Sequence, residues 1–374
     1  MKKLLCFGVF IAVLLCSFPV SAAKVSAKAA VVINGDTGEI IYSHNPDKRL
    51  PMASTTKIMT ALLLCEKGDL KREITVTAEM LRVEGSSMGL LSGDKVTLHD
   101  LLYGMMLASG NDAANVTAYT LGGTVDGFVK MMNDKAAELG LKNTHFDTPS
   151  GLDGESHYTT AYELGLLARY AMQNEEFAKA AASKSATLCY GNPPYRRTLT
   201  NHNRLLKTFD GAVGVKTGFT KKSGRCLVTA ARRDGKFVIA VTLNDPDDWR
   251  DHTALLEYGL NKVRLTKVEP ERQSIQVAVV GGVSENIKIT IPSATFSSLE
   301  NEKITAQINL PKFVFAPIIK GEKIGSVVYK KGDTLIKETE LLSDDNINER
   351  ALKLSFWDSF TEKFRYIFLG IWEK

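Results

Sequence analysis

Two blocks of strand-like sequence enclose a long helical stretch before about residue 262, and this order constrains the fold more than any other feature. Residues 29–33 and 40–43 are apolar, β-branched runs joined by the Gly-Asp-Thr-Gly turn at 35–38, which predicts an opening hairpin. Strand-like runs return between 211 and 243. Segments with helical periodicity lie at 55–65, 98–108, 112–121, 125–139, 161–172 and 251–261. One α/β domain with both of its ends in the same sheet accounts for this order.

Local signals at the helix ends support this interpretation. Thr97 and Thr160 are each followed three residues later by an acidic residue, which predicts a capping box at two helix starts. Glycines at 122, 123 and 140 close two of the helical segments.

Beyond about Val263 the sequence changes to strict alternation of apolar and polar residues. Residues 275–279, 287–291 and 304–310 alternate as half-buried strands do. This region contains no histidine, no cysteine and no cluster that suggests catalysis. We therefore expect a first domain of residues 24–262 and a small all-β domain of residues 263–345 with a spacer or interaction role.

The first residues have the three parts of a secretory signal peptide. Two lysines precede the apolar run 4–16 and the small residues 19–23, so we expect cleavage of residues 1–23 and export of the protein. A lipidated Cys16 is the alternative, but Leu15 occupies the position that needs a small residue.

The final segment, residues 346–374, has an amphipathic helical pattern. Its apolar residues recur mostly at three- and four-residue steps: Leu354, Phe356, Trp357, Phe360, Phe364, Ile367, Phe368, Ile371 and Trp372. Charged residues interrupt any apolar run of the roughly 20 residues needed to cross a bilayer. The helix either packs on its own domain or lies in a membrane interface, and the export signal favours the interface.

Composition and charge exclude several classes of protein. The chain is 44% apolar and 24% charged, which is too balanced for a disordered or fibrous protein. The formal net charge of +5 falls to +3 without the two lysines of the leader, so it gives no indication of a nucleic-acid partner.

Cysteine and histidine patterns do not indicate a metal or a cofactor. Cys65, Cys189 and Cys226 remain after the leader, and we expect buried thiols, with a Cys189–Cys226 disulfide as the alternative in an oxidising compartment. The sequence has neither a C-x-x-C nor an H-E-x-x-H pattern. We expect no metal and no organic cofactor.

Ser54 and Lys57 form the first of three short motifs that carry chemistry. A hydroxyl and an amine three residues apart share one face of a helix. The same S-x-x-K spelling occurs at Ser21 and Ser92, but the first lies in the leader and the second contains a Gly-Asp turn. A serine hydroxyl becomes a good nucleophile only when a base takes its proton, and a lysine can do this only as the neutral amine.

The other two motifs follow in order along the chain. An S-x-N motif at 109–111 lies at a break between helical segments, and a K-T-G motif at 216–218 follows the strand-like residues 213–215. A second S-x-N match occurs at 284–286 in the expected β domain, and a similar K-S-G sequence occurs at 222–224. We call such matches outside the expected site decoys. Any one motif is weak, but the ordered set in an exported α/β protein is a strong signal.

Together the motifs resemble those of the penicillin-recognising serine enzymes. More specifically, the chain resembles the low-molecular-mass penicillin-binding proteins, which are serine-type D-alanyl-D-alanine carboxypeptidases, over nearly its whole length. Residues 54–59, 109–114, 143–146, 151–152 and 203–206 agree with that family as well. The resemblance implies a β-lactamase/transpeptidase-like sheet flanked by helices. It also implies removal of the terminal D-alanine from peptidoglycan stem peptides, with β-lactam antibiotics as covalent inhibitors.

In this interpretation Ser54 is the nucleophile and Lys57 is its base. Moving the pKa of a lysine from about 10.4 to about 7 requires about 4 to 5 kcal/mol of differential interaction. Burial, the second cation Lys216 and the positive end of the helix that begins at Ser54 all act in this direction.

The resemblance also implies roles for the remaining motif residues. Ser109 would relay a proton to the leaving group, and Asn111 would orient the substrate amide or Lys57. Lys216, Thr217 and Gly218 would hold the terminal carboxylate of the substrate.

Two further groups complete the expected site. The backbone N–H groups of Ser54 and Phe219 would stabilise the oxyanion. Arg250 would assist in binding the carboxylate, or it is a surface ion-pair partner. The expected partners are stem peptides, β-lactams and a membrane surface, and the expected location is the outer face of the cytoplasmic membrane.

Four alternatives remain. A D,D-endopeptidase would form the same acyl-enzyme from a cross-linked stem. A class A β-lactamase needs a glutamate in an E-x-x-L-N pattern between the second and third motifs, whereas the match at 257–261 follows both. A Cys–His hydrolase that uses Cys65 is weak, because nothing marks Cys65 as a thiolate. A non-catalytic cell-wall scaffold would keep the fold with an idle serine.

Overall fold

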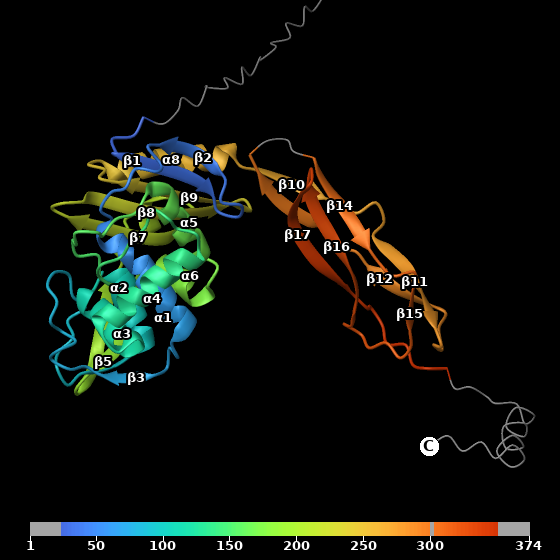
Figure 1. Cartoon of the computed structure of the whole chain (residues 1–374), viewed down its shortest axis with the longest axis horizontal. Coiled ribbons are helices and arrows are strands. Elements are labelled where there is room, and N and C mark those ends of the chain that lie inside the picture. The colour runs from blue at the N-terminus through green and yellow to red at the C-terminus, as the bar shows by residue number, and fades with distance from the viewer. Residues whose placement is uncertain (1–23, 300–302, 351–374) are drawn as a thin grey trace, which may run out of the picture. The chain divides into compact units, whose positions relative to one another are not determined.

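The computed structural model describes residues 24–299 and 303–350, which divide into two compact units between Arg264 and Leu265 (Figure 1). The first unit is α/β and the second is all-β, which confirms the predicted fold class. The expected leader and the amphipathic C-terminal segment lie outside the described residues. Within the described ranges, no helix is long and apolar enough to cross a membrane.

An antiparallel five-stranded sheet joins the two ends of the first unit, as the sequence predicts. Its strands, in spatial order, are β2 (Ile40–His44), β1 (Ala29–Asn34), β9 (Lys236–Leu243), β8 (Gly224–Arg233) and β7 (Ala212–Thr220). β1 pairs with β2 in the predicted hairpin and with β9 on its other side, so Ala29 lies opposite Leu243. β7 carries the K-T-G motif and forms one edge of this sheet.

Helices cover both faces of the sheet. They are α1 (Lys57–Lys67), α2 (Leu98–Leu107), α3 (Asn111–Gly122), α4 (Val125–Glu138), α5 (Ala161–Ala171), α6 (Glu175–Ala182), α7 (Leu205–Thr208) and α8 (Asp248–Lys262). Gly165 of α5 lies against Val31 and Ile33, whereas Gly259 of α8 lies against Val32. Because consecutive side chains of a strand point to opposite faces, α5 and α8 lie on opposite sides of the sheet.

The helix starts differ from the predictions in two details. A 3-10 turn, Ala53–Thr56, precedes α1, so Ser54 lies in this turn and not in the α-helix. The capping box of α2 forms as predicted, but at α5 only the Thr160 hydroxyl makes its half of the box. The Glu163 carboxylate turns away to accept hydrogen bonds from the backbone N–H of Asn143 and the Thr144 hydroxyl.

A second small sheet in this unit is not predicted by the sequence. Its strands, in spatial order, are β3 (Glu73–Thr75), β4 (Lys95–Thr97), β5 (Ser185–Gly191) and β6 (Pro194–Thr200). The three described cysteines are free thiols, so the Cys189–Cys226 disulfide does not form. Cys189 lies on β5 and is exposed, which makes the expectation of a buried thiol wrong at this position.

The second unit packs three small sheets around one aliphatic core. Its strands are β10 (Arg264–Val268), β11 (Ser274–Val280), β12 (Asn286–Thr290), β13 (Ala294–Ser298), β14 (Ile304–Asn309), β15 (Phe313–Phe315), β16 (Lys323–Lys331) and β17 (Thr334–Leu342). The sheets have the orders β10-β13, β12-β11-β15 and β14-β16-β17. Val277, Val279, Ile287 and Ile289 are among the buried residues of the core, as the alternating pattern predicts, and β16 adds Val327 and Tyr329.

Candidate active site

The first motif places a buried amine beside a serine hydroxyl. Lys57 Nζ lies 3.0 Å from Ser54 Oγ. The same Nζ donates hydrogen bonds to Asn111 Oδ1 at 2.7 Å and to the carbonyl oxygen of Ser150 at 2.6 Å. Burial, followed by the charge of Lys216, lowers the pKa of Lys57 well below its ordinary value. The amine therefore has the environment of a neutral base.

The second and third motifs meet through their side chains. Lys216 Nζ donates hydrogen bonds to Ser109 Oγ at 3.0 Å and to the carbonyl oxygen of Thr217 at 2.9 Å. Burial lowers the pKa of Lys216 to about 7. Ser109 lies between α2 and α3 with a positive φ of 56°, a conformation that non-glycine residues seldom adopt. Two hydroxyls and two lysines from three motifs thus converge on one site.

The start of α3 fixes the loop above this site. Asn111 Nδ2 donates to the carbonyl oxygen of Glu84 at 2.6 Å, while its Oδ1 accepts from Lys57. The neighbouring Asp112 carboxylate accepts hydrogen bonds from the backbone N–H groups of Met88, Gly89 and Leu90. Because both side chains are held by the loop, they have little freedom to move away from Lys57.

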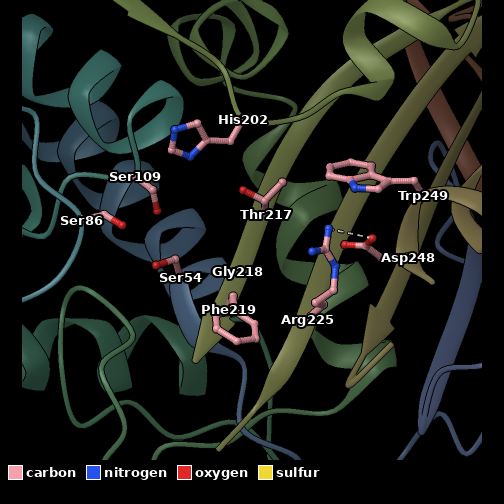
Figure 2. A pocket seen from close by; sticks show the side chains of 10 residues that line it. All are labelled: Ser54, Ser86, Ser109, His202, Thr217, Gly218, Phe219, Arg225, Asp248 and Trp249. Carbon is pink, nitrogen blue, oxygen red and sulfur yellow. Dashed lines mark ion pairs between the residues drawn. The ribbon is translucent and has the colours of Figure 1, made fainter. Parts of the chain in front are cut away.

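A pocket of about 330 Å³ opens over Ser54 and Ser109 (Figure 2). Its lining contains five residues that the sequence predicts, Ser54, Ser109, Thr217, Gly218 and Phe219. Its other lining residues are Ser86, His202, Arg225, Asp248 and Trp249. Three further predicted residues, Lys57, Asn111 and Lys216, are buried and contact the lining hydroxyls or each other.

Glycine at position 218 is required by the close approach of β7 to the turn that carries Ser54. A Cβ atom at this position would lie 3.0 Å from the backbone nitrogens of Ser54 and Thr55. Any larger residue would push β7 away from the serine. Phe219, the next residue, is 66% exposed at the pocket rim.

Arg250 does not line the pocket, and its charged partners are not residues of the three motifs. Its guanidinium lies 2.8 Å from Asp247 and 3.1 Å from Asp251, and its side chain is 65% exposed. This arrangement matches the surface ion-pair alternative. The pocket contains Arg225 instead, whose guanidinium lies 3.0 Å from the Asp248 carboxylate (Figure 2).

The sequence analysis missed Arg225 because its position depends on strand register. The β7–β8 hairpin places Arg225 directly opposite Phe219. Residues opposite each other in an antiparallel pair point to the same face of the sheet. The tight turn that follows Phe219 could therefore have indicated that Arg225 accompanies the K-T-G motif.

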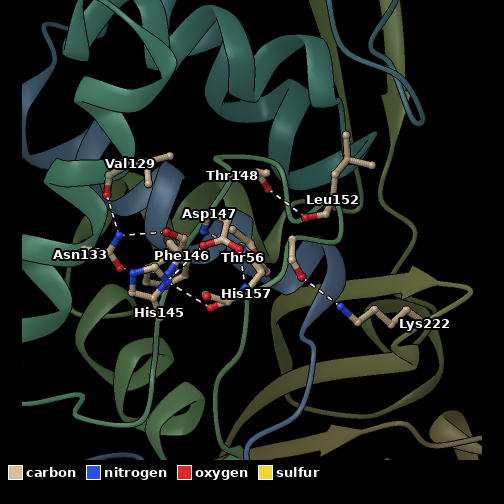
Figure 3. A network of polar contacts seen from close by, with 12 residues as sticks. Thr56, Val129, Asn133, His145, Phe146, Asp147, Thr148, Leu152, His157 and Lys222 are labelled. Carbon is tan, nitrogen blue, oxygen red and sulfur yellow. Dashed lines mark hydrogen bonds and ion pairs between the residues drawn. The ribbon is translucent and has the colours of Figure 1, made fainter.

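A buried histidine network supports the turn that carries Ser54 (Figure 3). The backbone N–H of Asp147 donates to His157 Nδ1 at 2.9 Å, so the proton of the neutral ring lies on Nε2. Nε2 is 2.7 Å from the Thr56 hydroxyl, which in turn donates to the carbonyl oxygen of Ala53. Burial lowers the pKa of His157 to about 4. The ring is therefore neutral near pH 7 and links Thr56 to the loop that carries Ser150.

Among the residues that the structure describes, no group of His, Cys, Asp and Glu has the arrangement of a metal site.

Comparisons with known proteins place this geometry in a family. The family model described as D-alanyl-D-alanine carboxypeptidase matches residues 17–247. The chain belongs to the D-alanyl-D-alanine carboxypeptidase family. A second model, described as penicillin-binding protein 5, C-terminal domain, matches residues 267–349. The resemblance inferred from the three motifs is thereby confirmed.

Relatives in this carboxypeptidase family match most of the chain. D-alanyl-D-alanine carboxypeptidase DacF of Bacillus subtilis is 32% identical, with 86% of each chain covered. D-alanyl-D-alanine carboxypeptidase DacC of Escherichia coli is 29% identical, with 94% of this chain and 92% of the relative covered. A D-alanyl-D-alanine endopeptidase of Pseudomonas aeruginosa is 32% identical over only 55% of this chain. The endopeptidase alternative is therefore not favoured.

Solved structures of the family agree with the fold. The D-alanyl-D-alanine carboxypeptidase DacD from Francisella tularensis has a TM-score of 0.63 and 26% identity, and the match covers 89% of this chain and 96% of that one. The Streptomyces K15 DD-transpeptidase has a TM-score of 0.62 and 34% identity, and the match covers 64% of this chain and 99% of that one.

Proposed function

We propose that this member of the family is a serine D-alanyl-D-alanine carboxypeptidase that releases the terminal D-alanine of peptidoglycan stem peptides. One observation supports the proposal most directly, the set of atoms around Lys57 Nζ. A neutral amine has two N–H bonds and one lone pair. The oxygens of Asn111 and Ser150 are acceptors only, so they take the two N–H bonds. The lone pair then faces Ser54 Oγ and can receive its proton.

The reaction proceeds in two halves. In the first, Lys57 takes the Ser54 proton while Oγ bonds to the carbonyl carbon of the penultimate D-alanine. The C–N bond then breaks, and the proton held by Lys57 passes through Ser109 to the departing amine of the terminal D-alanine, which leaves Lys57 neutral again. In the second half, water gives a proton to Lys57 and attacks the ester carbon. The C–Oγ bond then breaks and Lys57 returns the proton to Ser54 Oγ, which regenerates Ser54 and leaves the stem shortened by one residue.

Lys216 supports both halves by its charge and by its contact with Ser109. Its ammonium group keeps the pKa of Lys57 low, after the larger effect of burial. Its hydrogen bond to Ser109 Oγ orients that hydroxyl for proton transfer. The backbone N–H groups of Ser54 and Phe219 form the proposed oxyanion hole, where one donor contributes about 2.7 to 4 kcal/mol to catalysis in serine hydrolases.

The substrate carboxylate is proposed to bind beside Lys216, Thr217 and Gly218. We assign the assisting arginine to Arg225, because it lines the pocket whereas Arg250 is held by two acidic neighbours. Asp248 fixes the Arg225 guanidinium in place. β-Lactams are proposed to acylate Ser54 from the same pocket.

The release of D-alanine from a peptide that ends in D-Ala-D-Ala tests this function. We expect release by the full chain and none by Ser54→Ala, whereas Ser92→Ala, in the decoy S-x-x-K motif, keeps full activity. Intact-mass measurement after penicillin treatment should show one adduct, which Ser54→Ala abolishes. A folded full chain that releases no D-alanine would instead support the non-catalytic scaffold. Rapid multiple turnover of penicillin would support a β-lactamase.

We further propose that the protein is exported and bound to the outer face of the cytoplasmic membrane. In this proposal residues 1–23 are removed, residues 24–262 catalyse, residues 263–345 form a spacer, and residues 346–374 lie in the membrane interface. The amphipathic pattern of the last segment supports this arrangement. A chain that ends near Asp345 should be soluble after export. One that still sediments with membranes would refute the anchor.

A further inference from the structure

Exposed apolar side chains gather in the second unit, although it is the smaller one. In the described chain, large apolar side chains are exposed at four positions of the first unit and at nine of the second. Five of these nine lie between Val280 and Ile319: Val280, Val283, Phe313, Phe315 and Ile319. Contiguous exposed apolar patches of this kind mark interaction sites.

Strand register brings three members of this group onto one face. β15 pairs in parallel with β11, so Phe315 lies opposite Val280 and Phe313 opposite Ala278. The rings of Phe313 and Phe315 are in edge contact, with centroids 5.4 Å apart. Val314, between them, points inward to the core. The outer face of β11 and β15 therefore presents two phenylalanines that are 50% and 67% exposed.

The last described residues, 347–350, pair with backbone groups beside the exposed residues Val283 and Ile319. The backbone N–H of Val283 donates to Asn348, and that of Arg350 donates to Gly281. Ile347 pairs with Ile318, next to the exposed Ile319. The chain thus leaves the described structure at Arg350, beside the apolar group, and 24 residues of amphipathic sequence follow.

We propose that Val280, Val283, Phe313, Phe315 and Ile319, called here the apolar tip, insert into the surface of a lipid bilayer beside the C-terminal segment. The inference rests on the proposed membrane attachment and assigns a task to the β unit. Basic residues accompany the tip, since Lys312 precedes Phe313, Lys320 follows Ile319, and Arg350 adjoins Gly281, although Glu285 lies 3.9 Å from Arg350. Phenylalanine side chains flanked by lysines suit the boundary between acyl chains and headgroups.

Two features argue against other occupants of the tip. Pro311 and Pro317 flank the three-residue strand β15, so its edge offers little backbone for pairing with a second copy of the chain. The apolar stripe of the C-terminal segment has nine residues, six of them aromatic residues that can each bury on the order of 150 Å² or more. Five half-exposed side chains are too few to cover that stripe, whereas a bilayer can accommodate both.

Vesicle binding by the full chain tests the proposal. The probe is vesicles of phosphatidylglycerol and phosphatidylcholine, and the variant is Phe313→Ser with Phe315→Ser. We expect roughly tenfold weaker binding because the inserted apolar area is reduced. Leu335→Ser is the matched control, since Leu335 is 57% exposed on β17 of the same unit. Equal binding by the two variants would overturn the proposal.

A second measurement does not depend on the stability of the serine variant. The full chain has Trp357 and Trp372 in its C-terminal segment, so its own emission on vesicles is the reference. Relative to that reference, Phe315→Trp should add a blue-shifted component when vesicles are added, whereas Leu335→Trp should add none. A blue-shifted signal before vesicles are added, with tighter binding by the serine variant, would show that the C-terminal segment covers the tip. Loss of a dimer in the serine variant would show that a second copy does. Either result overturns lipid insertion.

Release of D-alanine from a soluble peptide separates this inference from the proposed function. Both tip variants should retain the rate of the full chain, because neither residue belongs to the catalytic unit. A chain that lacks carboxypeptidase activity but loses vesicle binding in the variant would refute the function and retain the tip. A chain that releases D-alanine but binds vesicles equally well in all variants would retain the proposed function and refute membrane insertion of the apolar tip.

Discussion

The two units handle polar groups in opposite ways. Every buried Asp, Glu, Lys and His side chain among the described residues lies in the first unit, including Lys57, Asp112, His157, Lys216 and His252. The buried polar residues of the second unit are serines. A buried charge or unpaired polar group opposes folding, so such groups are kept only where something other than stability requires them. The difference identifies the first unit as the place of chemistry before any motif is considered.

Removal of the buried base Lys57 tests most strongly whether the buried charges of the first unit serve chemistry. We expect Lys57→Ala to lower the acylation rate by about 10⁴-fold or more, because Ser54 then has no neighbour that can take its proton. The rate of labelling by a fluorescent penicillin measures the effect. Lys95→Ala, in the decoy motif, should label at the normal rate. Normal labelling of a folded Lys57→Ala protein would show that another group is the base.

One glycine in each unit tests whether the backbone is more tightly packed near the active site than in the second unit. Gly151 has φ +89° and a Cβ there would lie 2.0 Å from the carbonyl oxygen of Ala53, whereas Gly281 has φ +76° and open space around it. We expect Gly281→Ala to cost about 1 to 2 kcal/mol of stability from backbone strain alone. Gly151→Ala should cost at least about 3 kcal/mol and also reduce acylation.

Thermal unfolding and labelling of both glycine variants provide the measurement. Equal losses of stability in the two variants would mean that the loop beside Ser54 moves aside freely.

The pH dependence of unfolding should distinguish the units as well. Burial lowers the pKa of His157 to about 4 and that of His252 to about 3. Between pH 6.5 and about 4 the unfolded chain therefore binds protons that the folded chain does not. Stability of the first unit should fall with decreasing pH in this window, by up to about 1.4 kcal/mol per pH unit for each histidine.

The second unit has no histidine and should lack this dependence. Calorimetry at several pH values separates the two transitions. His157→Gln and His252→Gln should each reduce the slope of the first transition by about one proton. An unchanged slope in both variants would contradict the burial of neutral histidines.

The smallest expected effect concerns the two arginines near the pocket. Arg225→Leu should lower kcat/KM about tenfold for peptides with a free terminal carboxylate and have little effect on peptide amides, because a charged hydrogen bond is lost. Arg250→Leu should behave like the unchanged protein. A tenfold loss in Arg250→Leu with none in Arg225→Leu would show that Arg250 binds the substrate carboxylate.

Local spacing explains which parts of the site can be predicted from the sequence. Ser54 and Lys57 share one turn, so their contact follows from helical geometry. The contact of Lys216 with Ser109 joins residues 107 positions apart, and only the order of the motifs suggests it. Arg225 requires the register of a hairpin, which short motifs do not encode.

The same reasoning applies to the fold. Periodic apolar segments predict the main sheet, the long helices and the β unit, because each buries a regular face. The small sheet of β3 to β6 escapes prediction, since its strands are mostly exposed and therefore lack an apolar rhythm. The capping box at Thr160 forms only in half, because the Glu163 carboxylate bonds to the distant residue Asn143 and not to the backbone N–H of Thr160. Local sequence patterns do not indicate such a tertiary contact.

The pairing of β1 with β9, the first and last strands of the first unit, determines when the active site can form during synthesis. Ala29 can find Leu243 only after more than two hundred intervening residues have been synthesised, and such distant closures are slow. A nascent chain threaded through a translocation channel would therefore stay inert, with its nucleophile and its cations still apart. For a chain exported as proposed, reactivity would begin only after residues 24–262 have crossed the membrane.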